Sequence, residues 1–235
     1  MKTLAPLILA VALAVPAAAK SKASASLAPS VPAVQETPNP ADAMGVSIHR
    51  LPNGLTVYLS PNKGEPRIAA RIVVRAGSKN DPADSTGMAH YLEHMLFKGT
   101  GRLGTLDYEK ERPQLERIRA LYEDLFKTKS ESARAKIYKE IDAANGRASA
   151  FAVPNEFDRF YRSIGAEGLN AYTSDEQTVY VVSIPANRLE AWAKVEAERF
   201  KSPVFRLFQT EIETVYEEKN RSLDNAERII SDEVD

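Results

Sequence analysis

The chain has 235 residues, and its 31 lysines and arginines nearly balance 32 aspartates and glutamates, leaving a net charge of -1. This balance gives no support to polyanion binding, so we expect no nucleic-acid partner. The sequence contains no cysteine, which excludes disulfides and thiolate metal ligands. Any metal would therefore be held by histidine and carboxylate side chains.

The first 19 residues have the pattern of a secretory signal peptide. Lys2 supplies a positive charge, residues 4–15 are apolar, and three alanines ending at Ala19 form a cleavage site. The apolar run is short for a bilayer span, and a retained N-terminal anchor is the alternative interpretation. We therefore expect export to the periplasm, or secretion, after cleavage near Ala19, with no membrane span in the mature chain.

Residues 20–43 are rich in alanine, serine and proline and show neither a helical nor a strand period, which predicts a flexible tether. The folded part is expected to extend over residues 44–235. It begins with a β-hairpin, because two β-prone runs at 46–50 and 55–59 flank an Asn-Gly turn. His49 lies in the first run, where a surface or cross-strand position is favoured over a metal-ligand role.

Residues 67–75 alternate in polarity, which predicts a half-buried strand, and a helix follows that strand. Three residues offer N-cap oxygens for the helix: Asp84, Ser85 and Thr86. Gly99 provides its stop. The predicted apolar stripe of the helix consists of Ala89, Leu92, Met95 and Leu96.

This helix carries the pattern His90-x-x-Glu93-His94, which contains two of the chain's three histidines. On a helix, positions i and i+4 share a face and i+3 lies beside them, so the three side chains are expected to converge. Two neutral imidazoles suit zinc, and the carboxylate can take a proton from metal-activated water. An ordinary amphipathic helix is the alternative, but the full pattern favours a zinc site that hydrolyses peptide bonds.

Residues 101–155 predict an antiparallel helical hairpin. Its first helix has Pro113 near its start and runs to about residue 129, and its second helix spans about 132–144 with Asn145 and Gly146 as its stop. The inward-facing residues are predicted to be Leu115, Ile118, Tyr122, Leu125, Ile137 and Ile141. The many lysines and glutamates are expected to form a solvated face.

Five further elements are predicted after the hairpin. In chain order they are a helix at 156–164, antiparallel strands at 168–173 and 177–184, an amphipathic helix at 189–201, and a helix at 209–222. The only tryptophan, Trp192, is assigned to the core.

The last of these helices carries the candidates for a third metal ligand. A zinc site with two histidines still needs another protein ligand, and a carboxylate is the remaining option. Glu211 and Glu218 are seven residues apart and lie on nearly the same face. Spacing alone leaves four candidates open: Glu211, Glu213, Glu217 and Glu218.

Several stretches, taken together and in this order, resemble the pitrilysin/insulinase metallopeptidases, which have an inverted H-x-x-E-H zinc motif. They are LPNGLTVYLSPN, the alternating strand before a Gly-Ser, TGMAHYLEHMLFKGT, GLNAYTSDEQTVY, a helix ending in AERF, and EIETVYEEKN. The matching pieces span most of residues 46–224. The resemblance implies an α+β fold of the mitochondrial-processing-peptidase type, with a mostly antiparallel or mixed sheet, helices on one face, and the 101–155 hairpin as an insertion.

The resemblance also implies roles for individual residues. His90 and His94 would bind one zinc ion per chain, and Glu93 would be the general base of a zinc metalloendopeptidase. The resemblance selects Glu218 as the third ligand by matching EIETVYEE to the family's glutamate-rich distal helix. Glu211 then takes the place of an accessory acidic residue that orients the site.

The stretch NAYT is similar to the family's exposed edge strand, to which a substrate peptide adds as an extra strand. Asn170 and Ala171 would take part in that pairing. The family's catalytic domain continues beyond the distal helix, and a second, similar domain or subunit closes over the cleft. We therefore expect an incomplete N-terminal domain that needs such a partner, and the alternative is a non-catalytic or partner-dependent metal-binding subunit.

Overall fold

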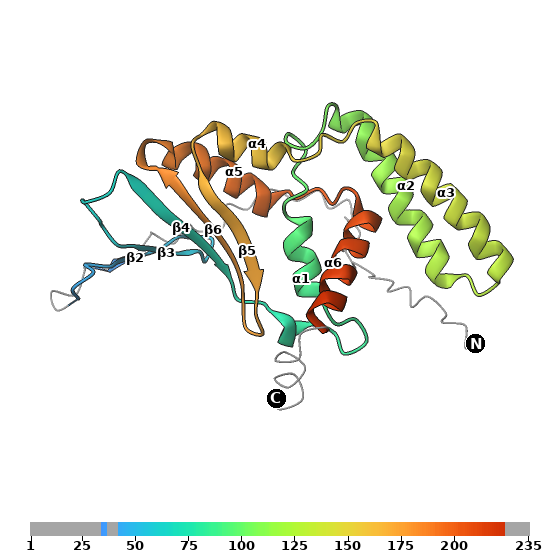
Figure 1. Ribbon diagram of the computed structural model, residues 1–235, viewed down its shortest axis with the longest axis horizontal. Helices are drawn as coiled ribbons and strands as arrows, with labels where there is room; N and C mark the ends of the chain where they lie inside the picture. The colour runs from blue at the N-terminus through green and yellow to red at the C-terminus, as the bar shows by residue number, and fades with distance from the viewer. Residues whose placement is uncertain (1–33, 37–41, 224–235) are drawn as a thin grey trace, which may run out of the picture. The chain divides into compact units, whose positions relative to one another are not determined.

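The computed structural model describes residues 34–36 and 42–223 (Figure 1). The predicted signal peptide and most of the predicted tether lie outside the described residues. The chain divides into two compact units at the boundary between Pro66 and Arg67. No helix in the described part of the chain is long and apolar enough to cross a membrane.

The unit before this boundary contains a three-stranded antiparallel sheet of order β1-β2-β3. Strands β2 (Ser47–Arg50) and β3 (Thr56–Leu59) form the hairpin that the Asn-Gly turn predicted. Strand β1 (Val34–Glu36) pairs with β2, so the expectation of a structureless tether over 20–43 is wrong for these three residues. The pairing satisfies backbone groups of β1, and a composition-based prediction does not detect such pairing.

The second unit is built on a three-stranded antiparallel sheet of order β4-β6-β5. Strand β4 (Arg67–Val74) pairs with β6 (Thr178–Pro185), which pairs in turn with β5 (Glu167–Thr173). The predicted alternation is confirmed in β4, where Ala70 is buried and Arg71 is exposed. Strand β6 is buried or half-buried at every position because it is the central strand, whereas β5 lies at an edge of this sheet.

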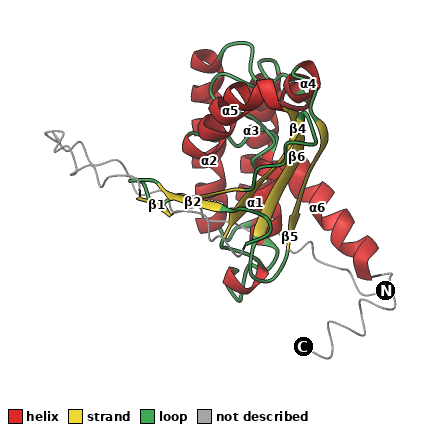
Figure 2. Cartoon of the chain, turned by 90° about the vertical axis from the view of Figure 1, so that its left-hand side faces the viewer, coloured by secondary structure: helices red, strands yellow, loops and turns green. Residues whose placement is uncertain are grey.

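Helices α4 (Glu156–Ser163) and α5 (Leu189–Lys201) pack on one face of this sheet (Figure 2). The core between them consists of Ala70, Phe157, Tyr161, Val182 and Ile184. Trp192 packs against this core, as predicted. Burial of each large apolar side chain contributes about 1.5–3 kcal/mol, so this layer supports the sheet. The arrangement confirms the predicted α+β class with helices on one sheet face.

Helix α1 (Met88–Met95) lies between strand β5 and helix α6 (Phe208–Leu223) (Figure 1). Its buried stripe is formed by Tyr91 and Met95, and the Tyr91 hydroxyl donates a hydrogen bond to the Phe208 carbonyl at 3.1 Å. The prediction that Leu92 belongs to the buried stripe is wrong, because this side chain is 41% exposed. The register of α1 is set by its two neighbours rather than by apolarity alone.

The start of α1 is capped from a distance. The N-cap residue is Gly87, which has a φ of 91° and no side-chain oxygen, so the prediction of a cap from residues 84–86 is wrong. Instead, the Asp81 carboxylate accepts hydrogen bonds from the backbone N–H groups of Gly87 at 2.7 Å and Ala89 at 2.8 Å. The negative charge of this carboxylate also interacts favourably with the positive end of the helix dipole. Asp81 directly follows the short 3-10 helix η1 (Ser78–Asn80).

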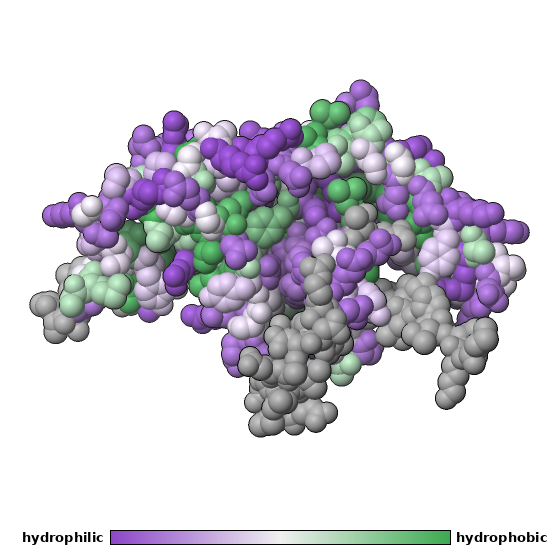
Figure 3. Space-filling model, viewed as in Figure 1, coloured by the Kyte–Doolittle hydropathy of each residue, from purple (hydrophilic) through white to green (hydrophobic). Residues whose placement is uncertain are grey.

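Helices α2 (Tyr108–Lys127) and α3 (Glu131–Ser149) form the predicted helical hairpin, whose exposed side chains are mostly hydrophilic (Figure 3). Their shared buried residues are Ile118, Leu121, Leu125, Ile141, Ala144 and Ala148. The prediction that α3 stops at residue 144 is wrong, because Ala144 and Ala148 pack in the core and carry the helix through Gly146. Helix α2 begins five residues before Pro113 and is capped by Asp107.

Arg206 joins the segment before α6 to the loop after α1 and to α2. Its guanidinium Nε donates to Oε1 of Glu111 at 2.7 Å, and both residues are buried. Its Nη1 and Nη2 groups donate to the backbone carbonyls of Lys98, Thr100 and Leu103 at 2.6–3.2 Å. Four of the five guanidinium N–H groups are thus hydrogen-bonded, and they hold the entry of α6 close to the exit of α1. Another 3-10 helix, η2 (Ala186–Arg188), leads into α5.

Candidate metal centre

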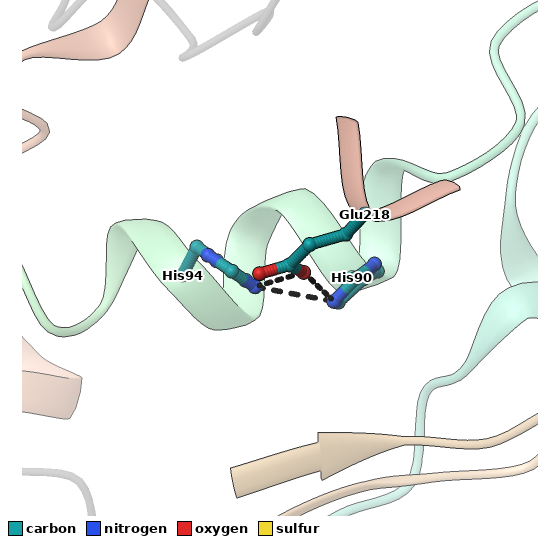
Figure 4. Close-up of side chains that lie close together, drawn as sticks. All are labelled: His90, His94 and Glu218. Atoms are coloured by element: carbon teal, nitrogen blue, oxygen red, sulfur yellow. Dashed lines mark hydrogen bonds and ion pairs between the residues drawn. The ribbon is translucent and has the colours of Figure 1, made fainter. Parts of the chain in front are cut away.

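Two histidines of α1 and one glutamate of α6 lie together (Figure 4). The Nε2 atoms of His90 and His94 are 3.1 Å apart. The Oε2 atom of Glu218 lies 3.5 Å from Nε2 of His90 and 3.4 Å from Nε2 of His94. The three donor atoms thus form a nearly equilateral triangle built from two elements that are more than 100 residues apart in the chain.

The size of this triangle fits a tetrahedral zinc ion. Zinc binds nitrogen and oxygen at about 2.0–2.2 Å, which places the ligand atoms of a tetrahedron about 3.3 Å apart. The three measured separations, 3.1, 3.4 and 3.5 Å, lie close to that value. Three protein donors leave one corner of the tetrahedron for water or substrate, as in catalytic rather than structural zinc sites. His90, His94 and Glu218 could therefore hold one zinc ion.

Glu211 hydrogen-bonds with the imidazole of His94. Its Oε1 atom lies 2.9 Å from Nδ1 of His94, and its other oxygen pairs with the ammonium group of Lys98. With the proton assigned to Nδ1, this nitrogen donates to Glu211 and the Nε2 lone pair faces Glu218. Glu211 is only 7% exposed, so the contact is held within the protein interior rather than by solvent-exposed side chains.

Electrostatics at the site favour a positive charge. The hydrogen bond to Glu211 raises the pKa of His94, the charges of Glu218 and Glu93 act in the same direction, and desolvation opposes them. The same hydrogen bond from His94 lowers the pKa of Glu211, with Lys98 adding to the effect. Three carboxylates around two imidazoles therefore create a field that a divalent cation would neutralise.

Glu93 lies on α1 between the two histidines, and its carboxylate is turned toward strand β5. It is 6% exposed and accepts a hydrogen bond from the Thr173 hydroxyl at 2.5 Å. The two imidazoles thus meet Glu218, while Glu93 lies beside them, close enough for its charge to raise the pKa of His94. A carboxylate in this position could transfer a proton without being one of the three donors.

The other candidates from the sequence are not members of this donor group. Glu213 and Glu217 are exposed on α6 and are not part of the donor group found among the described residues. His49 lies in β2, where its imidazole hydrogen-bonds with the Ser47 hydroxyl at 3.1 Å. The tertiary structure therefore distinguishes Glu218 from Glu213 and Glu217, two of the candidates that spacing left open.

Asn170 and Ala171 lie in β5, the edge strand of its sheet. They pair with Val181 and Tyr180 of β6, and Asn170 is exposed. On the side of β5 away from β6, no strand pairs with it among the described residues. The strand ends at Thr173, whose hydroxyl contacts Glu93, so the free edge leads directly to the candidate centre.

Sequence reasoning missed three residues of this centre: Lys98, Asp81 and Thr173. Lys98 follows His94 by four positions, and this spacing could have indicated a shared face just beyond the helix. Asp81 and Thr173 gave no comparable signal, because their contacts with α1 depend on the packing of distant segments. Thr173 lies in the NAYT stretch, for which the family resemblance predicts only backbone pairing with a substrate.

Comparisons with known proteins identify relatives. A family model described as Insulinase (Peptidase family M16) matches residues 56–115, which include the H-x-x-E-H motif. Insulin-degrading enzyme of Homo sapiens is 27% identical over 169 residues, or 72% of this chain and 12% of that protein. A probable mitochondrial-processing peptidase subunit beta of Arabidopsis thaliana is 39% identical over 61 residues, or 26% of this chain and 12% of that protein.

A solved structure shares the fold. The crystal structure of the first half of the periplasmic protease PqqL from Escherichia coli matches with a TM-score of 0.53 and 19% sequence identity. The match covers 85% of this chain and 33% of that chain. The expected fold type is thereby confirmed. This chain spans only 12% of the length of each of the two curated relatives named above.

Proposed function

This chain belongs to the pitrilysin/insulinase family of metallopeptidases and corresponds to its N-terminal portion, and on that premise we propose that it is a zinc-dependent endopeptidase acting on extended peptides. The observation that carries the proposal is the donor triangle of His90, His94 and Glu218. A second carboxylate, Glu93, lies beside that triangle and is not one of its donors. Two imidazoles, a liganding carboxylate and an adjacent base are the parts that metal-assisted hydrolysis requires.

We assign His90, His94 and Glu218 as the ligands of one zinc ion per chain. Zinc bound there would activate a water molecule and polarise the scissile carbonyl. Glu211 would keep His94 in the tautomer that presents Nε2, because it accepts the Nδ1 proton. Lys98 would in turn hold Glu211 in place.

Glu93 is proposed as the general base. It would take the proton of the attacking water and later deliver it to the leaving amine. Its position on α1 between the two histidines keeps it near the reacting atoms, and its low exposure limits competition from bulk solvent. Such positioned proton transfer contributes about 10²–10⁴-fold to a rate.

The proposed substrate is a peptide that adds to the free edge of β5. Backbone groups around Asn170 and Ala171 would pair with it, which requires an extended substrate but little sequence specificity. Because β5 runs toward Thr173 and Glu93, a peptide on this edge would be led to the catalytic groups. The side chains of the substrate would alternate toward and away from the sheet face.

We further propose that a second homologous domain or subunit closes over the centre. This chain covers a third of the solved first half of the periplasmic protease PqqL, which supports a two-part arrangement. Export to the periplasm is likewise proposed from the signal-peptide pattern of residues 1–19 and from the periplasmic location of PqqL. The second candidate function is a metal-binding subunit that is inactive alone, favoured by the openness of the donor group, in which the side chains of His90 and Glu218 are 39% and 41% exposed.

Peptide cleavage by the purified chain, alone and with a candidate second half, tests the proposal. Cleavage should require zinc, stop with a chelator, and fall by at least about 100-fold in Glu93→Gln while zinc stoichiometry stays at one. Zinc binding without cleavage in the isolated chain, with cleavage only in the mixture, would favour the partner-dependent subunit. Loss of zinc in Glu93→Gln would contradict the assignment of Glu93 as a base that is not a ligand.

A further inference from the structure

The Glu93 carboxylate is held by a side chain from another element. Thr173, the last residue of β5, donates its hydroxyl proton to Oε2 of Glu93 at 2.5 Å. The two residues are 80 positions apart in the chain. Glu93 is 6% exposed, and a buried carboxylate without a donor would be strongly destabilising. The Thr173 hydroxyl is therefore well placed to fix the orientation of this carboxylate.

The available protons support this direction of donation. The neighbouring hydroxyl of Thr178 donates to the backbone carbonyl of Ala76 at 2.9 Å, which uses its only proton. It lies 3.4 Å from the Thr173 hydroxyl, a separation too long for a strong hydrogen bond. The single proton of Thr173 is thus left for Glu93. A hydrogen bond to an ionised acceptor is shorter and stronger than one between neutral groups.

We propose that Thr173 is a positioning residue, which fixes the Glu93 carboxylate by one oxygen and leaves the other free for proton transfer. The inference rests on the proposed function in so far as Glu93 is the base, but the contact itself is independent of it. Thr173 also belongs to the strand whose edge is proposed to bind substrate. One strand would therefore set the position of both the peptide and the base, which keeps the distance between them constant.

The test compares three variants of the full chain. Thr173→Val keeps the side-chain shape but removes the hydroxyl, and Thr173→Ser keeps the hydroxyl. Thr178→Val is the matched control, because it removes a buried hydroxyl from the paired position of the adjacent strand without touching Glu93. The readouts are crystal structures of the metal-free chains and their zinc stoichiometry. In addition, kcat and KM for peptide cleavage are measured in a preparation in which the wild-type chain is active.

We expect Glu93 to leave its observed conformation in Thr173→Val and to keep it in Thr173→Ser and Thr178→Val. Zinc stoichiometry and KM should stay unchanged in Thr173→Val, while kcat falls about 10- to 100-fold, the effect of a misplaced catalytic group. Thr173→Ser should restore most of kcat. This split between kcat and KM would not follow from a general loss of folded protein.

Two results would overturn the inference. One is a Thr173→Val chain in which Glu93 keeps its conformation. The other is a Thr178→Val chain in which Glu93 moves as much as in Thr173→Val, since strand distortion would then be the cause. If the wild-type chain cleaves no peptide in any preparation, the proposed function fails, but the crystal structures still decide whether Thr173 positions Glu93.

Discussion

The Nδ1 atom of His94 lies 2.9 Å from Oε1 of Glu211, and this contact fixes which nitrogen of the imidazole faces the donor triangle. Because Glu211 is buried and also paired with Lys98, it cannot turn away without leaving two charges unpaired. Helix α6 therefore supplies both Glu218 and the carboxylate of Glu211, which holds His94 by the nitrogen that faces away from the donor triangle. This arrangement gives the first prediction.

Glu211→Gln should weaken zinc binding by about 10- to 100-fold, because the neutral amide holds the imidazole less firmly and reduces the negative field. Competition with a chromophoric chelator measures the change. Glu213→Gln removes a charge from an exposed position of the same helix and serves as the control. Equal losses in the two variants would show that only the net charge of α6 matters.

Glu218→Gln should reduce zinc stoichiometry well below one, whereas Glu217→Gln should leave it unchanged. The reason is geometric, since only Glu218 contributes an oxygen to the donor triangle. Metal analysis after gel filtration of each variant gives the answer. Equal zinc contents in the two variants would remove Glu218 as a ligand.

Zinc should stabilise the folded chain, because the donor triangle exists only when α1 and α6 are packed together. At a free zinc concentration 100 times the dissociation constant, the free energy of unfolding should rise by about 2.7 kcal/mol. For a chain of this size, that corresponds to an increase in melting temperature of about 5–10 °C. Thermal unfolding with zinc, and again after chelation, measures it.

Magnesium is the control for this experiment, because it prefers octahedral oxygen ligands and should give no comparable shift. The double variant His90→Ala/His94→Ala should lose the zinc-dependent increase in melting temperature. A zinc effect that persists in the double variant would place the binding site elsewhere on the chain.

Arg206→Met should lower the free energy of unfolding by about 3–5 kcal/mol, because it leaves the buried carboxylate of Glu111 without its partner. Removing both charges in Arg206→Met/Glu111→Met should cost less than the single change. Urea unfolding of the three chains measures both effects. Since Arg206 holds the entry of α6, the single variant should also bind zinc more weakly.

Arg102→Met is the matched control for this prediction. Its side chain is 84% exposed, and its contact with Glu198 is 3.4 Å long. Such a surface pair contributes at most about 1 kcal/mol. A loss in Arg102→Met as large as that in Arg206→Met would contradict the role given to burial.

Much of the local structure could be predicted because it depends on short-range rules. The Asn-Gly turn gave the β2–β3 hairpin, and period-2 alternation gave β4. Helix α5 was predicted with its observed bounds, Leu189–Lys201. Errors occurred where packing overrides local preference, as in α3, which continues through Gly146 because alanines on either side are buried against α2.

At the candidate centre, the sequence by itself determined that His90 and His94 share one face of a helix, because that follows from a spacing of four residues. It could not choose among the four glutamates of α6, nor show that Asp81 caps α1 or that Thr173 holds Glu93. Those contacts join segments far apart in the chain, and packing brings them together. Helical geometry acts over a few residues, whereas the position of α6 against α1 depends on Tyr91, Phe208 and the buried Arg206.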